Sequence, residues 1–322
     1  MRHVAEEAGV SPALVSIVFR DAPGASEGTR RRVREAADRI GYVVDERARL
    51  LRRSRSQDVG IVFQTGQPFH QQLIDELYTA VEAAGGTVIL SGTSTTRDER
   101  AALAGLVAYR PGAIVLLGTE LDEEALRALA GDIPLVSLAR PLGEGTAWVA
   151  SDDAAALTLA VDHLAERGHR EVLFATASGA AGEPQRREAF TAAADRHGLA
   201  ARVEEGGTTE RSGAALAARL LDAGSLPGAV IAFNDRSALG LLHVLALRGI
   251  AVPDQIAVVG IDDSEIASRD HVDLTSVAQD TAGLAAAAAE LAREAMDRRG
   301  RPGPATAGHR VLPVHLVVRG SA

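Results

Sequence analysis

Side chains that suit contacts with phosphate crowd a short stretch near the start of the chain. A threonine is followed there by three arginines, Thr29, Arg30, Arg31 and Arg32, at the start of a helical pattern. A guanidinium donates hydrogen bonds in a planar fork and a hydroxyl adds a further donor, so this set matches phosphate oxygens. Such contacts position a protein on a nucleic-acid backbone without reading its sequence. A solvated arginine-rich face is the alternative interpretation.

Three short predicted helices position these arginines. Residues 4–20 hold two of them around a turn at Gly9, which permits the positive φ of a tight turn. Ser11 offers an N-cap oxygen, and Pro12 suits the first helical position. The third predicted helix spans about residues 27–40. This layout is typical of a helix-turn-helix, although two amphipathic helices around a glycine turn also occur in proteins that never contact DNA.

The charge is unevenly distributed along the 322 residues, whose net charge is -9. Residues 1–57 contain 12 arginines against 8 aspartates and glutamates, a net charge of +4, which leaves -13 for residues 58–322. A basic segment attracts phosphates, whereas an acidic one repels them. The asymmetry predicts a DNA-binding head joined to a body with a different task.

Several classes of protein lack their motifs in this chain. No glycine-rich dinucleotide fingerprint follows the first predicted strand, and a chain without lysine has no P-loop. The absence of cysteine excludes disulfides and thiolate chemistry, and the nine histidines are dispersed. No catalytic constellation is visible, so we expect neither an enzyme nor a metal site. No stretch is long and apolar enough to span a bilayer, and the N-terminus lacks the apolar segment of a secretory signal, which predicts a cytoplasmic protein without a membrane partner.

From Asp58 onward, apolar strand patterns alternate with helical ones. The strand candidates are residues 87–90, 113–117, 135–138, 172–175, 229–233 and 256–260, after a first strand at 59–63. The helix candidates are residues 71–84, 98–108, 122–130, 154–167, 184–197, 213–221 and 237–248. Continuous apolar strands that alternate with helices indicate parallel sheets covered on both faces. The strands are too many for one small sheet, so we predict two doubly wound sheets with ligand sites at the carboxyl ends of their strands.

The residues as a whole resemble the LacI/GalR family of transcriptional regulators, over essentially the entire chain. The matching segments, in chain order, are Val4-Ala5, Ala8-Gly9-Val10-Ser11-Pro12-Ala13, Val15-Ser16, Ser26, Thr29-Arg30, Val33, Ile40-Gly41-Tyr42, Gly168-His169-Arg170, Phe233-Asn234-Asp235, Ala238-Leu239-Gly240, Val252-Pro253, Ile256 to Asp263 and Leu274 to Val277. Each segment is a weak signal alone, and their joint order is a strong one.

The resemblance implies an α/β protein with a three-helix helix-turn-helix head, a hinge helix and a periplasmic-binding-protein-like body of two doubly wound parallel-sheet subdomains. The implied boundaries are 1–45 for the head, 46–57 for the hinge helix and linker, 58–150 plus about 280–310 for the N-terminal effector subdomain, and 151–279 plus about 311–322 for the C-terminal one. It further implies a repressor that binds double-stranded, pseudo-palindromic operator DNA as a homodimer. A small-molecule effector, a sugar or sugar derivative, would bind between the subdomains, with no cofactor.

By matching position, the resemblance assigns DNA contacts to Ser11, Pro12, Ala13, Ser16, Ile17, Ala48 and Leu51. Thr29 and Arg30 are phosphate contacts by residue type, and Arg20, where the family commonly has asparagine, could restore a phosphate contact. Leu51 would wedge into the minor groove, or would pack against the body instead. Ile17 stands where the family usually has an arginine that reads a guanine, and Asp45-Glu46 brings two carboxylates near phosphate. These departures keep open the alternative of a ligand sensor with a degenerate DNA-binding head.

The same resemblance assigns effector contacts to seven residues. They are Phe69, His70, Arg140, Arg186, Asn234, Asp235 and Asp262. Carboxylates, an amide and guanidinium groups suit polyols, because each hydroxyl both donates and accepts. Asn234 and Asp235 could instead cap the following helix, Asp262 could shape a turn, and Phe69 could belong to the core. A solute-binding protein and an enzyme on an α/β scaffold are the rival functions, which export or turnover of a bound sugar would reveal.

Overall fold

The computed structural model describes residues 1–19, 22–42, 56–299 and 308–322. The chain forms two compact units, a head (Met1–Ser56) and a body (Gln57–Ala322). The predicted DNA contacts Arg20, Ala48 and Leu51 lie outside the described residues, as does most of the predicted hinge helix with Asp45-Glu46. None of the described helices is long and apolar enough to cross a membrane.

The head is a bundle of three short helices. They are α1 (Arg2–Ala8), α2 (Pro12–Phe19) and α3 (Glu27–Arg39). Their apolar faces enclose a small core of Val4, Ala5, Ala8, Val15, Val18, Val33, Ala36 and Ala37. Phe19 and Tyr42 pack against this core with their ring centroids 5.8 Å apart. An ion pair of 3.1 Å between Glu7 and Arg39 ties α1 to α3 on the outside.

The turns of the head confirm the predicted helix boundaries. Gly9 ends α1 at a φ of 63°, in the left-handed region that favours glycine. The Ser11 hydroxyl accepts a hydrogen bond from the Leu14 N–H at 3.2 Å, and the Ser26 hydroxyl accepts one from the Thr29 N–H at 3.3 Å. Both serines therefore satisfy N–H groups at the starts of the helices that follow.

The first subdomain of the body is built on an all-parallel sheet in the order β11-β5-β4-β3-β1-β2. Its strands are β1 (Val59–Gln64), β2 (Val88–Thr93), β3 (Ala113–Leu117), β4 (Leu135–Leu138), β5 (Ala147–Ser151) and β11 (His309–Leu312). Its helices are α5 (Pro68–Ala83), α6 (Glu99–Ala108), α7 (Glu123–Ala130) and α12 (Thr281–Arg298). The apolar core under α5 and α12 lies on one face of the sheet, and the core under α6 and α7 lies on the other.

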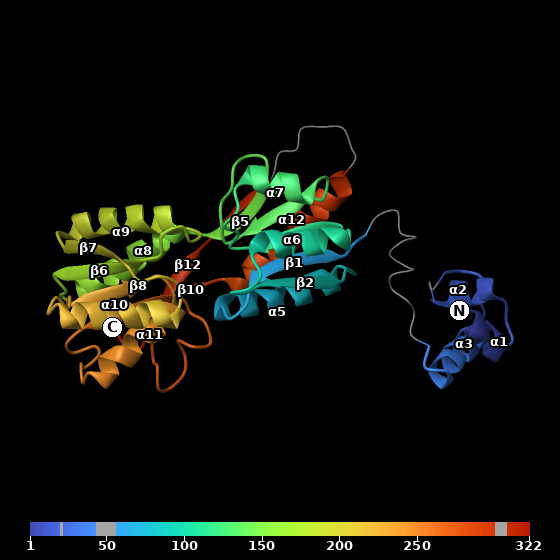
Figure 1. Ribbon diagram of the computed structural model, residues 1–322, viewed down its shortest axis with the longest axis horizontal. Coiled ribbons are helices and arrows are strands. Elements are labelled where there is room, and N and C mark those ends of the chain that lie inside the picture. The colour runs from blue at the N-terminus through green and yellow to red at the C-terminus, as the bar shows by residue number, and fades with distance from the viewer. Residues whose placement is uncertain (20–21, 43–55, 300–307) are drawn as a thin grey trace. The chain divides into compact units, whose positions relative to one another are not determined.

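The second subdomain has the sheet order β12-β10-β9-β8-β6-β7, with only β12 antiparallel to its neighbour among these strands (Figure 1). Its strands are β6 (Glu171–Thr176), β7 (Ala200–Glu205), β8 (Ala229–Ala232), β9 (Ala257–Asp262), β10 (Thr275–Gln279) and β12 (Val314–Val317). Helices α8 (Asp153–Glu166) and α9 (Glu183–His197) cover one face, and α10 (Glu210–Asp222) and α11 (Asp235–Leu247) cover the other.

The predicted fold class is confirmed, and every strand and helix candidate of the body lies within two or three residues of an observed element. Five strands, β5, β7, β10, β11 and β12, and the helix α12 were absent from the predicted elements. Strands β7, β11 and β12 lie at sheet edges and contain charged residues or histidine, whereas β5 and β10 contain serine, so none of them is a continuous apolar run. The alanines of α12 occupy both its buried and its exposed faces, which blurs the helical period.

Candidate functional site

A buried ion pair joins two helices of the second subdomain. Arg186 lies on α9, and its Nε donates to Oδ1 of Asp153, at the start of α8, over 2.7 Å. Its Nη1 donates to the Phe233 carbonyl over 2.7 Å, and the guanidinium stacks 4.6 Å from the centroid of the Phe233 ring. The two charged side chains are only 8% and 11% exposed, so water screens this pair weakly. The arrangement fixes both charges at the carboxyl end of β8.

A chain of hydrogen bonds connects the two subdomains. Ser151 ends β5 in the first sheet, and its hydroxyl donates to Oε1 of Gln279, which ends β10 in the second sheet, over 2.5 Å. The amide of Gln279 donates in turn to Oδ1 of Asp262 over 2.7 Å. The Asp152 N–H donates to the Leu312 carbonyl over 2.9 Å, which ties the crossover after β5 to the end of β11. The segments that pass from one sheet to the other therefore share one polar network.

The Asp262 carboxyl of this network has a strongly raised pKa, and its backbone has a positive φ. Burial raises its pKa well above the ordinary value and the neighbouring Asp235 raises it further, whereas Arg186 and the Gln279 hydrogen bond lower it. Its backbone φ is 116°, and that of Asp263 is 49°, in a region where non-glycine residues are strained. Hydroxyls of a bound molecule would supply the donors that a buried carboxylate needs.

Asn234 and Asp235 hold the structure beneath this network together. Asn234 caps α11, because its Oδ1 accepts from the Ser237 N–H over 2.8 Å. Asp235 is fully buried and accepts hydrogen bonds from the N–H and hydroxyl of Ser264 and from the hydroxyl of Ser276. Burial raises the pKa of the Asp235 carboxyl to about 7, against the opposing effect of these hydrogen bonds. Capping and anchoring, the alternatives to ligand contact, therefore account for the observed positions of both side chains.

The first subdomain contributes neutral groups near the carboxyl ends of β1 and β3. Burial lowers the pKa of His70 to about 4, so its imidazole is uncharged at neutral pH. Its Nδ1 accepts from the Gln64 N–H over 3.1 Å, which places the proton on Nε2, near Gly118. Phe69 is buried in the core under α5 rather than turned outward. Arg140 donates to the carbonyls of residues 119 and 121 and so holds the loop after β3.

An open pocket of about 610 Å³ lies where the crossovers meet. Its lining comes from both subdomains: Gln72, Asp262, Asp263, Ala278, Gln279, Asp280, Thr281, Ala282, Pro313, Val314 and His315. Oε1 of Gln72 is buried and has no hydrogen-bond partner among the described residues. The hydrogen-bonding capacity of a buried acceptor of this kind is satisfied only when a ligand or water donates to it. The pocket therefore combines a free acceptor with the Gln279–Asp262 network.

Arg186 and Asp262, both predicted effector contacts, lie close enough for the charge of Arg186 to lower the pKa of Asp262, and three residues that the sequence analysis missed lie beside them. Asp153 pairs with Arg186, Gln279 positions Asp262, and Gln72 lines the pocket. Asp153 lies two residues after β5, a strand that was not predicted, so the strand-end signal that identified Asp262 was missing for it. Gln279 also ends a strand, although that strand was not predicted. Gln72 had no signal beyond its nearness to His70 on the same helix.

The predicted DNA-contact residues of the head are unequally exposed. Ser11, Pro12 and Ala13 are exposed at the start of α2, whereas Ser16 and Ile17 are half-buried on the same helix. The Thr29 hydroxyl shares a hydrogen bond of 2.9 Å with the Ser26 hydroxyl. Arg30 is half-buried, and its guanidinium donates to the Ala22 carbonyl over 2.5 Å, which holds the loop before α3. The most accessible part of the predicted reading surface is therefore the first turn of α2.

The described residues contain no group of three or more histidine, aspartate or glutamate side chains that could hold a metal ion.

Residues 1–45 match the family described as bacterial regulatory proteins, lacI family, and residues 161–322 match the periplasmic binding protein-like domain. The chain belongs to the LacI family. The predicted resemblance to LacI/GalR regulators is thereby confirmed.

Named relatives of this LacI-family chain are transcriptional regulators. The regulator CelR of Thermobifida fusca is 33% identical over 99% of this chain and 96% of its own length. A LacI transcriptional regulator from a Rhodococcus species is 42% identical, with a TM-score of 0.78 over 82% of this chain and 98% of that chain. The lac repressor dimer bound to operator and the anti-inducer ONPF is 25% identical, with a TM-score of 0.81 over 99% and 97%. The CelR–cellobiose complex is 28% identical, with a TM-score of 0.74 over 99% and 98%.

Proposed function

We propose that this LacI-family protein is an effector-responsive, DNA-binding repressor that acts in the cytoplasm and catalyses no reaction. One observation supports it above the others: a helix-turn-helix head is joined to a body whose crossovers between two sheets meet at a pocket that both subdomains line. A ligand at that pocket contacts both subdomains, so its binding energy can change their relative arrangement.

The effector that fits this pocket is a sugar or a sugar derivative. Asp262 and Gln279 supply acceptors and donors at the pocket in fixed orientations, and Gln72 adds a free acceptor. The Arg186–Asp153 pair lies outside the pocket lining and acts on Asp262 through its charges. Neighbouring hydroxyls of a sugar both donate and accept, so they can satisfy such a set in full. The similar CelR was solved with cellobiose, which supports the same class of ligand. His70 adds an uncharged N–H donor from the first subdomain.

The head would bind a pseudo-palindromic operator, and two copies of the chain would bind it together. The similar lac repressor was solved as a dimer on its operator, which supports this assembly. Ser11, Pro12 and Ala13 are exposed at the N-terminal turn of α2, the part of a recognition helix that reaches base edges. Because Ile17 offers only apolar atoms, we expect it to contact a thymine methyl rather than a guanine.

A thermal-shift screen of the full-length protein tests the effector part of this proposal. Monosaccharides and disaccharides would be added one at a time, and a ligand at 100 times its Kd stabilises the folded state by about 2.7 kcal/mol, a visible rise in Tm. Asp262→Asn should abolish the rise, whereas Asp254→Asn, on the exposed loop before β9, should retain it. A panel without any hit, or a hit unaffected by Asp262→Asn, would argue against the pocket as the effector site.

Operator binding requires a separate measurement. Full-length protein would select binding sequences from a random double-stranded library, and fluorescence anisotropy would then measure affinity at several salt concentrations. We expect a two-fold symmetric consensus and an affinity that falls steeply with salt. Enrichment of no sequence would leave the degenerate-head alternative as the better description.

A further inference from the structure

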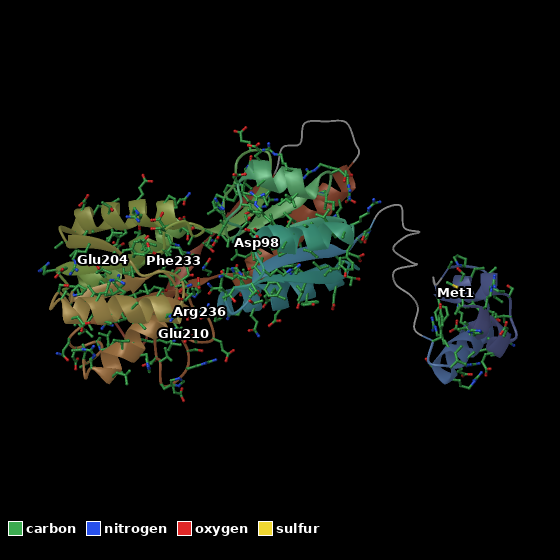
Figure 2. The ribbon with its side chains drawn as sticks, in the orientation of Figure 1. Met1, Asp98, Glu204, Glu210, Phe233 and Arg236 are labelled. Atoms are coloured by element: carbon green, nitrogen blue, oxygen red, sulfur yellow. The ribbon has the colours of Figure 1, made fainter. Side chains whose placement is uncertain are left out.

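The guanidinium of Arg236 lies at the border of the two subdomains and has few interaction partners. It is the second residue of α11 and follows the carboxyl end of β8. Its side chain is 25% exposed, so it is largely withdrawn from water. The nearest carboxylate oxygen, Oε1 of Glu210, lies 3.9 Å from its Nε, which is beyond hydrogen-bond distance. Figure 2 shows Arg236 and Glu210 side by side at this border.

The first subdomain presents bare backbone to this guanidinium. Gly66 follows β1, and a Cβ placed on it would stand 3.8 Å from Nη2 of Arg236 and 4.0 Å from Nη1. Because Gly66 has no side chain, it offers Arg236 no side-chain acceptor from the first subdomain. The described residues offer Arg236 no ion pair besides that with Glu210.

The other arginines of the site have their donors engaged. Arg186 bonds to the Asp153 carboxylate and the Phe233 carbonyl, and Arg140 bonds to backbone carbonyls after β3. A guanidinium has five N–H donors, which makes the weakly paired Arg236 the exception. Planar forks of this kind bind carboxylate and phosphate groups with two parallel hydrogen bonds.

Close helix packing keeps Arg236 in this position. A Cβ on Gly240 of α11 would stand 1.9 Å from the Glu210 carbonyl, so only glycine allows α10 to approach α11 so closely. Glu210 is therefore held beside the first turn of α11. Since its own side chain is 55% exposed, Glu210 can stay in water when another anion binds to Arg236.

We propose that Arg236 binds an anionic substituent of the effector, so that the preferred ligand is a sugar acid or a sugar phosphate. This inference rests on the proposed sugar-binding function. Asp153 already pairs with Arg186 at 2.7 Å, so Arg186 has no free charge to offer an anion, whereas hydroxyls can bond to the carboxyl of Asp262. Of these arginines, only Arg236 keeps donors for an anionic substituent of a ligand between the subdomains.

Matched pairs of probes test this proposal on the full-length protein. The pairs are glucose with gluconate, glucose with glucose 6-phosphate, and ribose with ribose 5-phosphate, measured by thermal shift and then by titration calorimetry. We expect an anionic member to bind at least tenfold more tightly than its neutral partner. The gluconate and phosphate arms show whether a carboxylate or a phosphate is preferred.

Two variants separate ligand contact from a general role of Arg236 in the fold. Arg236→Ala should remove the preference for the anionic member and leave the affinity for its neutral partner unchanged. Arg248→Ala is the matched control, because Arg248 caps the other end of α11 and pairs with Asp222 at 3.4 Å. It should preserve the preference.

Three outcomes would overturn the proposal. Equal affinity for both members of every pair, in a protein that binds sugars, would overturn the anion preference alone. A loss of both affinities in Arg236→Ala would show that Arg236 only supports closure of the two subdomains. A protein that binds no probe of either kind, and no sugar of the wider panel, would overturn the proposed function together with this inference.

Discussion

The two subdomains differ in how their ionisable groups are engaged at the boundary that they share. In the second, Asp153, Arg186 and Asp262 interact with one another, whereas in the first His70 is neutral and the guanidinium of Arg140 is bonded to backbone carbonyls. Burial acts on both sides, and it moves the pKa of a carboxyl upward and that of an imidazole downward. Under the proposed function, the second subdomain would orient a ligand through its charged network, and the first would add neutral contacts.

Of the variants predicted here, Arg186→Ala should cause the largest loss in the free energy of unfolding, because it breaks the charged network of the second subdomain. In Arg186→Ala the buried Asp153 carboxylate loses its partner and the Phe233 carbonyl loses a donor, which should cost about 3–5 kcal/mol in the free energy of unfolding. Urea denaturation at neutral pH measures the loss. Arg187→Ala is the control, because Arg187 is 45% exposed and pairs with Glu183 one turn away, an interaction that stabilises by about 0.3–0.5 kcal/mol. Equal losses in both variants would contradict a special role for the buried pair.

A pH series on Asp235→Asn should give the next largest effect. The folded pKa of about 7 lies above the unfolded value of 3.8, so between these limits the folded state keeps a proton that the unfolded state has released. The stability of the unsubstituted protein should therefore fall, relative to Asp235→Asn, as pH rises from about 4 to about 7. The full difference is about 4 kcal/mol from the conversion of about 1.4 kcal/mol per pKa unit. Parallel stability curves for the two proteins would show that Asp235 keeps an ordinary pKa.

A pH series on His70→Asn tests the first subdomain. Here the stability of the unsubstituted protein should rise with pH relative to the variant, opposite in sign to the Asp235 effect. The folded pKa of His70 is about 4 against 6.5 unfolded, so the unfolded state binds the proton between these limits and stability should rise with pH across them. In His70→Asn the amide oxygen can still accept from the Gln64 N–H, and the rise of about 3 kcal/mol should disappear. The double variant with Asp235→Asn should lose both slopes. A slope that persists in His70→Asn would assign it to another group.

The sequence allowed the fold to be predicted where one physical pattern dominates. Strands buried on both faces, such as β3, are continuous apolar runs and were found within a residue or two. Edge strands such as β7 mix alanine with charge, since one side of them faces water, and they escaped detection. The caps at Ser11 and Ser26 were predictable because a cap depends on residues only three positions away.

The site was less predictable, because its contacts join segments that lie far apart in the chain. Arg186 and Asp262 were identified by position, yet no spacing pairs Ser151 with Gln279, 128 residues later. Adjacent carboxylates posed a second difficulty. Asp152 caps α8 through the Ala155 N–H at 2.8 Å, which leaves Asp153 for Arg186, and the sequence does not tell these two apart.

The smallest expected effect tests whether the two sides of the boundary act together. Ser151→Ala removes the hydroxyl that donates to Gln279 across the two sheets, which should cost about 1–3 kcal/mol. Ser137→Ala is the matched control, because its buried hydroxyl donates to the Arg140 carbonyl within the first subdomain over 2.6 Å. Calorimetry should show a lower Tm for both variants, but a broadened or divided transition only for Ser151→Ala, since of these two bonds only that of Ser151 joins the subdomains. A single sharp transition in both would mean that the Ser151 bond adds stability without coupling the charged side to the neutral one.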